Sequence, residues 1–186
     1  MSGAAPVSQF SARELRDALG LFPTGVAVIT AHAVHGERLG LTVSSFNSVS
    51  IDPPLVLFSV AKNAKSIAGW ESINQFAVNI LDEKQSEIST RFAKALTDKW
   101  EGLDPSRAKV VDAPLIRDAL ASLECELWAR YDGGDHIIVV GKVVHLSRML
   151  QDNPRPLLFA TGRYRRLDSG TSIETPFDVS HLLHGW

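Results

Sequence analysis

The sequence predicts a mainly β domain, an antiparallel β-barrel with helices at its periphery. Two observations lead to this prediction. About six or seven short segments rich in β-branched and aromatic residues recur along a chain of 186 residues, separated by turns rich in Gly, Pro, Asn and Asp. The connections are also short, which favours antiparallel pairing over βαβ crossovers. Closing such a sheet into a barrel would remove its exposed edges.

The elements follow in order along the chain. A first helix is predicted after Ser11, which forms a capping box with Glu14, and this helix should end at Gly20. A short helix or turn is expected at 63–71, and Asp82 should cap a further helix. In chain order, the predicted strands are 26–31, 41–50, 55–60, 75–81, 123–131, 137–146 and 156–160.

Three segments predict how the core is arranged. Residues 123–131 alternate, so that one face carries Leu, Cys, Leu, Ala and Tyr. Residues 137–146 are almost continuously β-branched, which predicts a strand buried on both faces. Residues 94–114 show no clear periodicity and are expected to form a loop or a lid.

Composition excludes several classes of protein. The formal net charge of −2 leaves no basic field for nucleic acid or an anionic membrane surface. Cys125 is the single cysteine, so an internal disulfide and a cysteine-based zinc site are excluded, and a packing thiol is predicted. No apolar run approaches the roughly 20 residues that a membrane span needs, and the first residues do not resemble a signal peptide. A cytoplasmic protein is expected.

Standard catalytic and nucleotide-binding motifs are absent. The sequence has no GxGxxG, Walker A, HExxH or GxSxG pattern. His32 and His35 are closely spaced but fall in a predicted hairpin loop, so no metal site is predicted.

Three polar segments are candidates for chemistry. Residues 41–50 place hydroxyl groups along a strand, where they would bind a ligand edge or form a solvated edge strand. Residues 59–66 (SVAKNAKS) place two lysines before a short helix, which suits a phosphate or an ordinary polar turn. Residues 131–141 (YDGGDHIIVVG) place His136 at a strand entrance after two glycines, and a tight hairpin is the simpler interpretation.

Taken in order, these segments resemble the flavin reductase-like, FMN-binding split-barrel family, the reductase components of two-component flavin-dependent monooxygenases. The likeness spans roughly residues 15–167. Its matching stretches are FPTGVAVIT (22–30), LGLTVSSFNSVSIDPPLVLFSVAKNAKS (39–66), FAVNIL (76–81), RFA (91–93), DKW (98–100), LECELWARYDGGDHIIVVGKVV (123–144) and PLLFATGRYRRL (156–167). The order and spacing of these pieces make the resemblance specific.

The resemblance implies a flavin reductase-like split β-barrel over residues 1–167, followed by a C-terminal tail at 168–186. It also implies a homodimer that binds FMN or FAD near the subunit interface and takes a hydride from NADH or NADPH. His136 would position the nicotinamide ring during catalysis. The implied cofactor-binding residues are Thr42, Val43, Ser44, Ser45, Ala61, Lys62, Asn63, Lys65, Ser66, Asn79, Arg91, Phe92, Gly134, Asp135, Tyr164 and Arg165. Lys65 departs from the family pattern, which commonly has serine there.

The implied activity is NAD(P)H:flavin oxidoreduction that supplies reduced flavin to a partner monooxygenase. In such a reaction the cofactors carry the chemistry, and the protein provides stacking geometry and electrostatics. Two other classes remain open: a nonenzymatic flavin-binding electron carrier, and an F420-dependent or other flavin oxidoreductase on the same barrel.

Overall fold

The computed structural model describes residues 10–95, 98–150 and 152–168, so most of the expected C-terminal tail lies outside the described residues. Its helices are α1 (Ala12–Leu19), α2 (Ile67–Ser72), the 3₁₀ helix η1 (Glu83–Gln85) and α3 (Ser86–Ala93). Its strands are β1 (Thr24–Gly25), β2 (Ala27–His32), β3 (Arg38–Val43), β4 (Asn47–Ser50), β5 (Leu55–Ala61), β6 (Gln75–Ile80), β7 (Ser106–Arg107), β8 (Pro114–Leu115), β9 (Ala121–Gly133), β10 (His136–Arg148), β11 (Leu158–Ala160) and β12 (Arg163–Arg165). The mainly β prediction is confirmed.

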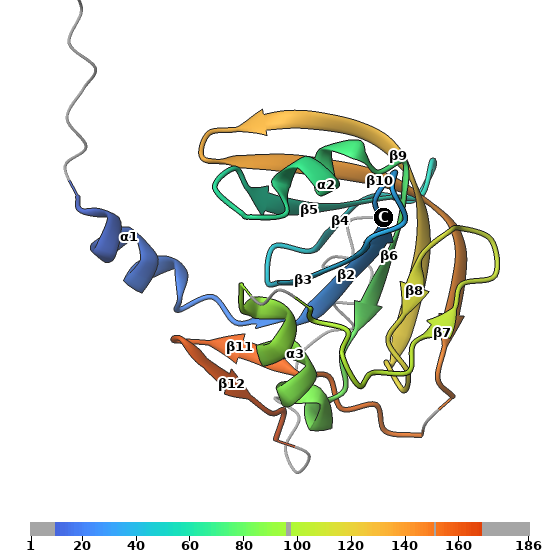
Figure 1. Cartoon of the computed structure of the whole chain (residues 1–186). Coiled ribbons are helices and arrows are strands. Elements are labelled where there is room, and N and C mark those ends of the chain that lie inside the picture. Colours follow the sequence, from blue (N-terminus) through green and yellow to red (C-terminus); the bar gives the residue numbers. More distant parts are fainter. Residues whose placement is uncertain (1–9, 96–97, 151, 169–186) are drawn as a thin grey trace, which may run out of the picture.

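Seven strands form one antiparallel sheet in the order β3-β2-β6-β9-β10-β5-β4, which rolls up as Figure 1 shows. The predicted strand 41–50 is split: β3 and β4 are the two edges of this sheet, joined by the link 44–46. So short a link spans at most about 14 Å, which holds the two edges near each other. Among the described residues the two edges do not pair, so the closed barrel that the strand pattern suggests does not form, and the split β-barrel that the resemblance implies is confirmed.

The main core fills the inside of the rolled sheet. The ring of Phe58 packs edge-on against Phe76, with 5.1 Å between centroids, and against Trp70 on α2, with 5.9 Å. A second core lies between the sheet and α3, where Phe92 packs edge-on against Trp100 at 4.9 Å. Because both rings of this second pair are buried, α3 is fixed against the outside of β3 and β2.

The expectation that 137–146 is buried on both faces is wrong. Only Val139, Val140 and Gly141 of that stretch are buried, and Leu146 is 64% exposed. The reason lies in the pairing, because β5 covers only the first half of β10, from His136 to Lys142. The second half pairs with β9 alone and is therefore a partly open edge.

Within the segment 94–114, the described residues 94–95 and 98–114 are mostly irregular, as expected of a loop, with only β7 and the start of β8 as regular structure, and they do not form a lid. Trp100, Val111 and Ala113 are buried. The buried carboxylate of Glu124 on β9 accepts hydrogen bonds from the backbone N–H groups of Lys109, Val110 and Val111, at 2.9, 2.7 and 3.1 Å. One ionised side chain thus anchors this stretch to the sheet, a role that the alternation pattern could not reveal.

The first helix stands apart from the barrel (Figure 1). Its predicted capping box is confirmed, with Ser11 and Glu14 exchanging hydrogen bonds, and it ends at Gly20 as expected. None of its residues is buried. No helix in the described part of the chain has the length and apolarity that crossing a bilayer requires.

Candidate functional site

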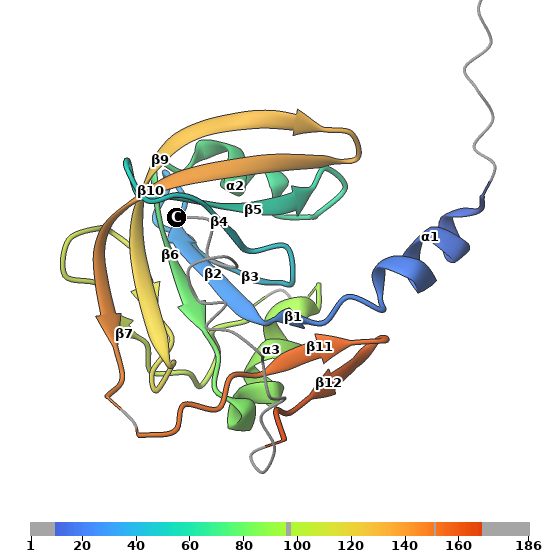
Figure 2. The same ribbon diagram turned by 180° about the vertical axis from the view of Figure 1, so that it is seen from behind.

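Three connections meet at one side of the split barrel. They are the link 44–46 between β3 and β4, the loop 62–66 between β5 and α2, and the turn between β9 and β10. All three point to the left in Figure 1 and to the right in Figure 2. Two of the three polar segments singled out in the sequence are joined directly, because His136 pairs with Ala61 in the β10–β5 ladder.

The turn after β9 is organised by two aspartates. Gly134 adopts a positive φ of 80°, which a residue without a Cβ tolerates, and its N–H donates to Asp132 at 2.8 Å. The other oxygen of Asp132 lies 3.0 Å from the Lys62 ammonium. These contacts, the Gly134 hydrogen bond first, lower the pKa of Asp132. Lys62 is therefore paired, and its backbone N–H also donates to the Asp135 carbonyl at 2.9 Å.

His136 is held by its neighbour. Its Nδ1 lies 2.7 Å from an oxygen of Asp135, and its side chain is 43% exposed. This hydrogen bond, together with the charge of His136, lowers the pKa of Asp135. A carboxylate can only accept, so Nδ1 carries the proton in this contact and Nε2 of a neutral ring is left as an acceptor.

The hydroxyl groups of residues 42–45 connect this side of the barrel to neighbouring elements. Ser45 accepts a hydrogen bond from the Ser59 N–H at 3.0 Å, which ties the link 44–46 to β5. Thr42 donates to the Ser89 carbonyl at 2.7 Å, so its hydroxyl joins β3 to α3. Val43 is buried in the core, whereas Ser44 is exposed. Of this predicted group, Ser44 and Ser45 thus face the open side of the barrel.

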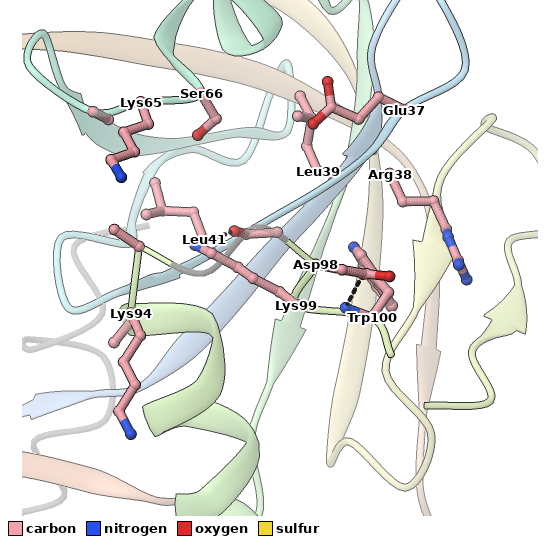
Figure 3. Close-up of a pocket in the computed structure, with 14 residues that line it drawn as sticks. Glu37, Arg38, Leu39, Leu41, Lys65, Ser66, Lys94, Asp98, Lys99 and Trp100 are labelled. Atoms are coloured by element: carbon pink, nitrogen blue, oxygen red, sulfur yellow. Dashed lines mark hydrogen bonds between the residues drawn. The ribbon is translucent and has the colours of Figure 1, made fainter. Parts of the chain in front are cut away.

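A hollow of about 520 Å³ lies beside these connections, between β3, the loop before α2 and the chain that follows α3 (Figure 3). Its ionisable lining comprises four basic side chains and two acidic ones, namely Arg38, Lys65, Lys94, Lys99, Glu37 and Asp98. The predicted residues Lys65 and Ser66 belong to it. Neither Lys65 nor Lys94 has a carboxylate partner among the described residues. In a chain of net charge −2, this hollow is a local cationic site.

The floor of this hollow was missed by the sequence reasoning. Lys99 is half-buried, and its ammonium donates to the carbonyls of Gly40 at 3.0 Å and Phe92 at 2.8 Å. Burial lowers the pKa of Lys99. It joins β3 to the end of α3 and so fixes two walls of the hollow. The DKW stretch carried part of the family resemblance, but its spacing alone gave no hint of this contact.

Several predicted residues lie elsewhere. Asn79 is fully buried, and its amide donates to the Val28 carbonyl and Thr30 and accepts from Ile116 and Ser122. Phe92 is also fully buried. Each has its side chain turned to the protein interior.

The remaining predicted residues lie around α3 and in the turn at 62–63. Arg91 donates to the Glu101 carbonyl at 2.6 Å. Tyr164 lies with its hydroxyl 2.8 Å from that of Ser89, and Arg165 donates to Thr161. The structure does not bring this pair together with His136 within one chain: β12 lies beside the lower part of α3 in Figure 1, and the β9–β10 turn lies at the opposite, upper end of the view. Asn63 is exposed in the turn that follows β5.

The chemistry of this region suits a planar cofactor with an anionic tail. Unpaired lysines at one end of a hollow favour a phosphate, since both hydrogen bonds and charge stabilise it there. α2 has only six residues, so the lysines rather than the helix end carry this preference. The adjoining side offers hydroxyl groups, backbone groups and one oriented imidazole. Among the described residues no group of His, Cys, Asp and Glu is arranged to hold a metal ion.

Comparisons with known proteins agree with this geometry. The sequence model of the family described as "Flavin reductase like domain" matches residues 19–168. "Flavin-dependent monooxygenase, reductase subunit HsaB" of Mycobacterium tuberculosis is 40% identical over 162 residues, which cover 87% of this chain and 85% of that protein. "FMN reductase (NADH) SmoA" of Agrobacterium fabrum is 39% identical over 84% of this chain and 86% of its own length.

Solved structures give the same result. The NADH:FAD oxidoreductase SgcE6 of Streptomyces globisporus, in complex with NAD and FAD fragments, has a TM-score of 0.81 at 36% identity, covering 91% of this chain and all of that one. A nitrilotriacetate monooxygenase component B homologue from Mycobacterium thermoresistibile has a TM-score of 0.80 at 39% identity, covering 90% of this chain and 93% of that one. This chain therefore belongs to the flavin reductase-like family.

Proposed function

We propose that this chain is an NADH:flavin oxidoreductase that supplies reduced flavin to a partner monooxygenase. The observation that carries the proposal is the position of His136, which pairs with Ala61 at the end of β5, directly before the loop that lines the hollow with Lys65 and Ser66. Relatives named as reductase subunits of monooxygenases and as NADH-dependent flavin reductases support it.

Two groups of residues would bind the two ends of the flavin nucleotide. Lys65 and Lys94 would hold the flavin phosphate, because their ammonium groups are free to pair with an anion. Ser44 and Ser45 would border the ring system, where the backbone of a link between two strand ends has N–H groups to donate. Lys62 would contribute indirectly and not by contact with the flavin, because its ion pair with Asp132 fixes the turn that precedes His136.

Bound flavin supplies the hydride acceptor, and the protein supplies orientation. His136 would position the nicotinamide by accepting, at Nε2, a hydrogen bond from the carboxamide N–H. The neighbouring Asp135 accepts a hydrogen bond from Nδ1–H, which leaves Nε2 as the acceptor in the neutral ring. The donor and acceptor atoms must come within about 3–3.5 Å for transfer, so this positioning would matter more than acid–base chemistry.

Assembly and location are part of the same proposal. Trp128, Tyr131 and Leu146 on the β9–β10 hairpin are 53%, 57% and 64% exposed, and a second copy of the chain would cover them in a homodimer. The single buried cysteine suits a reducing cytoplasm. We place the catalytic domain within residues 1–167 and treat 168–186 as a tail.

The test follows absorbance at 340 nm while purified protein is mixed with NADH or NADPH and with riboflavin, FMN or FAD. Flavin-dependent oxidation of NADH over many turnovers is expected. Flavin binding without oxidation of either nucleotide would refute the reductase and favour an electron carrier. Turnover with reduced F420 alone would favour a deazaflavin enzyme on the same barrel.

A further inference from the structure

We propose that a second pocket, beside α3, binds a small aromatic molecule that carries a hydrogen-bond donor, such as a phenol or an aromatic amine, and that this ligand tightens flavin binding through Trp100. Asp118 would accept the hydrogen bond from the donor. The effect on flavin rests on the proposed function, whereas the binding of the aromatic molecule does not.

The pocket is separate from the hollow that contains Lys65. It has a volume of about 310 Å³ and lies between the start of α3, the loop 100–105 and the segment 115–118. Of the described residues, Trp100 alone lines both spaces. The volume is at the lower end of the ~300–1,000 Å³ of small-molecule sites, which suits a ligand with one ring. Six of its lining residues are apolar, namely Ile88, Trp100, Leu103, Pro105, Leu115 and Ile116.

The walls of this pocket leave apolar surface open to water. Ile88 and Leu103 pack against the core between the sheet and α3, yet both are only half-buried. A ring that covers this surface would be stabilised by the hydrophobic effect. Trp100 adds an aromatic wall, and aromatic rings pack well edge-on or offset against one another. The walls therefore favour a flat apolar ligand.

The rim of the pocket is polar, and its charges are unevenly paired. The guanidinium of Arg117 is occupied, because it lies 2.9 Å from a carboxylate oxygen of Asp104 and donates to the Asp104 carbonyl at 2.7 Å. Asp118 has no hydrogen bond or ion pair among the described residues. An ionised carboxylate can only accept hydrogen bonds. The free group at the rim therefore suits a ligand with an N–H or O–H donor and repels an anion.

The backbone at Asp118 supports a role for its side chain. Its φ of 58° lies in the left-handed region, where a residue without a Cβ is least strained, although aspartate tolerates this conformation better than most residues. Glycine would fit the backbone here but would lack the carboxylate. An unpaired carboxylate at a strained position indicates a partner outside the chain.

Trp100 connects the pocket to the flavin side. Its ring is 3% exposed and packs edge-on against Phe92 at 4.9 Å, and the Arg38 guanidinium lies 5.6 Å from its centroid. The indole Nε1 has no hydrogen-bond partner among the described residues, so these contacts alone hold the ring. A ligand packed beside the ring would restrict its motion. One wall of the hollow, seen in Figure 3, would then already be ordered when flavin binds, which favours that binding.

The first experiment measures binding to the purified chain without flavin, by isothermal titration calorimetry. The probes are phenol and aniline, which carry a donor, and anisole and benzoate, which do not. We expect a Kd of about 1 mM or lower for phenol, a reasonable value for a ligand of about seven heavy atoms. Anisole and benzoate should bind about tenfold more weakly, because neither donates to Asp118.

Three variants assign the donor contact to its residue. Asp118→Gly should raise the Kd of phenol by about tenfold and leave that of anisole unchanged. Its melting temperature should not fall, because glycine adopts this conformation freely, so the loss cannot be ascribed to unfolding. Asp118→Asn keeps an acceptor oxygen and should retain most of the affinity. Asp17→Ala, at an exposed aspartate on α1, is the matched control and should change neither Kd.

The second experiment measures the coupling between the two sites. The Kd of FMN, from titration of flavin fluorescence, should fall by about fivefold or more when phenol is saturating. The Kd of phenol should fall by the same factor when FMN is saturating, because coupling between two bound ligands is reciprocal. Asp118→Gly should show the same limiting coupling but require about tenfold more phenol to reach it.

The outcomes separate this inference from the proposed function. A Kd for phenol above about 10 mM, or equal binding of phenol and benzoate, would overturn the pocket as assigned. Phenol that leaves the Kd of FMN unchanged, or that FMN displaces, would overturn the link through Trp100. A chain that shows the expected coupling but oxidises no NADH would refute the reductase and leave the aromatic pocket standing.

Discussion

Replacing Gly40 with alanine would test how the hollow is built. Gly40 is a buried residue in the middle of β3, and the ring of Phe92 lies directly over it. A Cβ at this position would stand 2.1 Å from Cε1 and 2.2 Å from Cδ1 of that ring. Ordinary contact between carbon atoms begins near 3.5 Å. The ring is fully buried, so it cannot turn away into solvent.

We expect Gly40→Ala to lower the free energy of unfolding by about 3 kcal/mol, the upper part of the range for overpacked cores. For a domain of this size the melting temperature should fall by about 6–12 °C. The apparent KM for flavin should also rise, because Lys99 bonds to the carbonyls of both Gly40 and Phe92. Urea unfolding followed by circular dichroism measures the stability, and flavin-dependent NADH oxidation measures the KM.

Gly25→Ala is the matched control, since a Cβ there meets nothing within 4 Å. Its free energy of unfolding should stay within about 1 kcal/mol of the unaltered chain. Combining Gly40→Ala with Phe92→Leu should recover part of the loss, because the smaller side chain makes room. A Gly40→Ala protein as stable as the control would refute the packing argument.

Three further predictions concern single side chains. The pKa of Glu124 is lowered: burial opposes this, but the N–H donors and the charge of His145 outweigh it. Glu124→Gln should therefore cost about 1.5–3 kcal/mol at pH 7, and urea midpoints should show this difference shrinking as the pH falls below the ordinary value of 4.5. Burial, with the nearby Glu124 charge, raises the pKa of Cys125 to about 12, so iodoacetamide at pH 8 should label it only after unfolding, and rapid labelling of the folded chain would contradict its burial. His136→Ala should raise the KM for NADH and lower kcat by less than about 10³-fold; a larger loss in kcat at unchanged KM would make His136 more than a positioning group.

The elements were predictable where a local rule decides them. The capping box of Ser11 and Glu14 needs only a hydroxyl and a carboxylate three residues apart. The strands follow from short β-branched runs between turns. The sequence did not place His136 beside Ala61, because strand pairing between distant segments leaves no mark in either one.

Burial was harder to predict than secondary structure. A β-branched run such as 137–146 has the same composition whether a neighbouring strand covers it fully or only for half its length. The burial and the structural role of two polar residues were not predicted for a related reason. Asn79 and Glu124 satisfy buried backbone groups on segments more than ten residues away, and periodicity within one strand carries no information about such partners.

The hollow was the least predictable part of the site. Its floor depends on Lys99, whose two partners belong to different elements, and its far end depends on the stacking of Arg38 on Trp100. Each contact joins residues that are unremarkable alone. The cationic character of the hollow is also hidden in the nearly neutral composition of the whole chain.

The link 44–46 lets the shape of the binding side change without disturbing the pairing of the strands in the sheet. It joins the two edge strands, yet within the described chain those strands share no ladder hydrogen bond. Each edge is held by its inner neighbour, β3 by β2 and β4 by β5. A change in the length of this link would therefore shift one rim of the site against the other while every strand pair stayed intact. Evolution can thus widen or narrow the mouth of this barrel by insertions here without rebuilding its core.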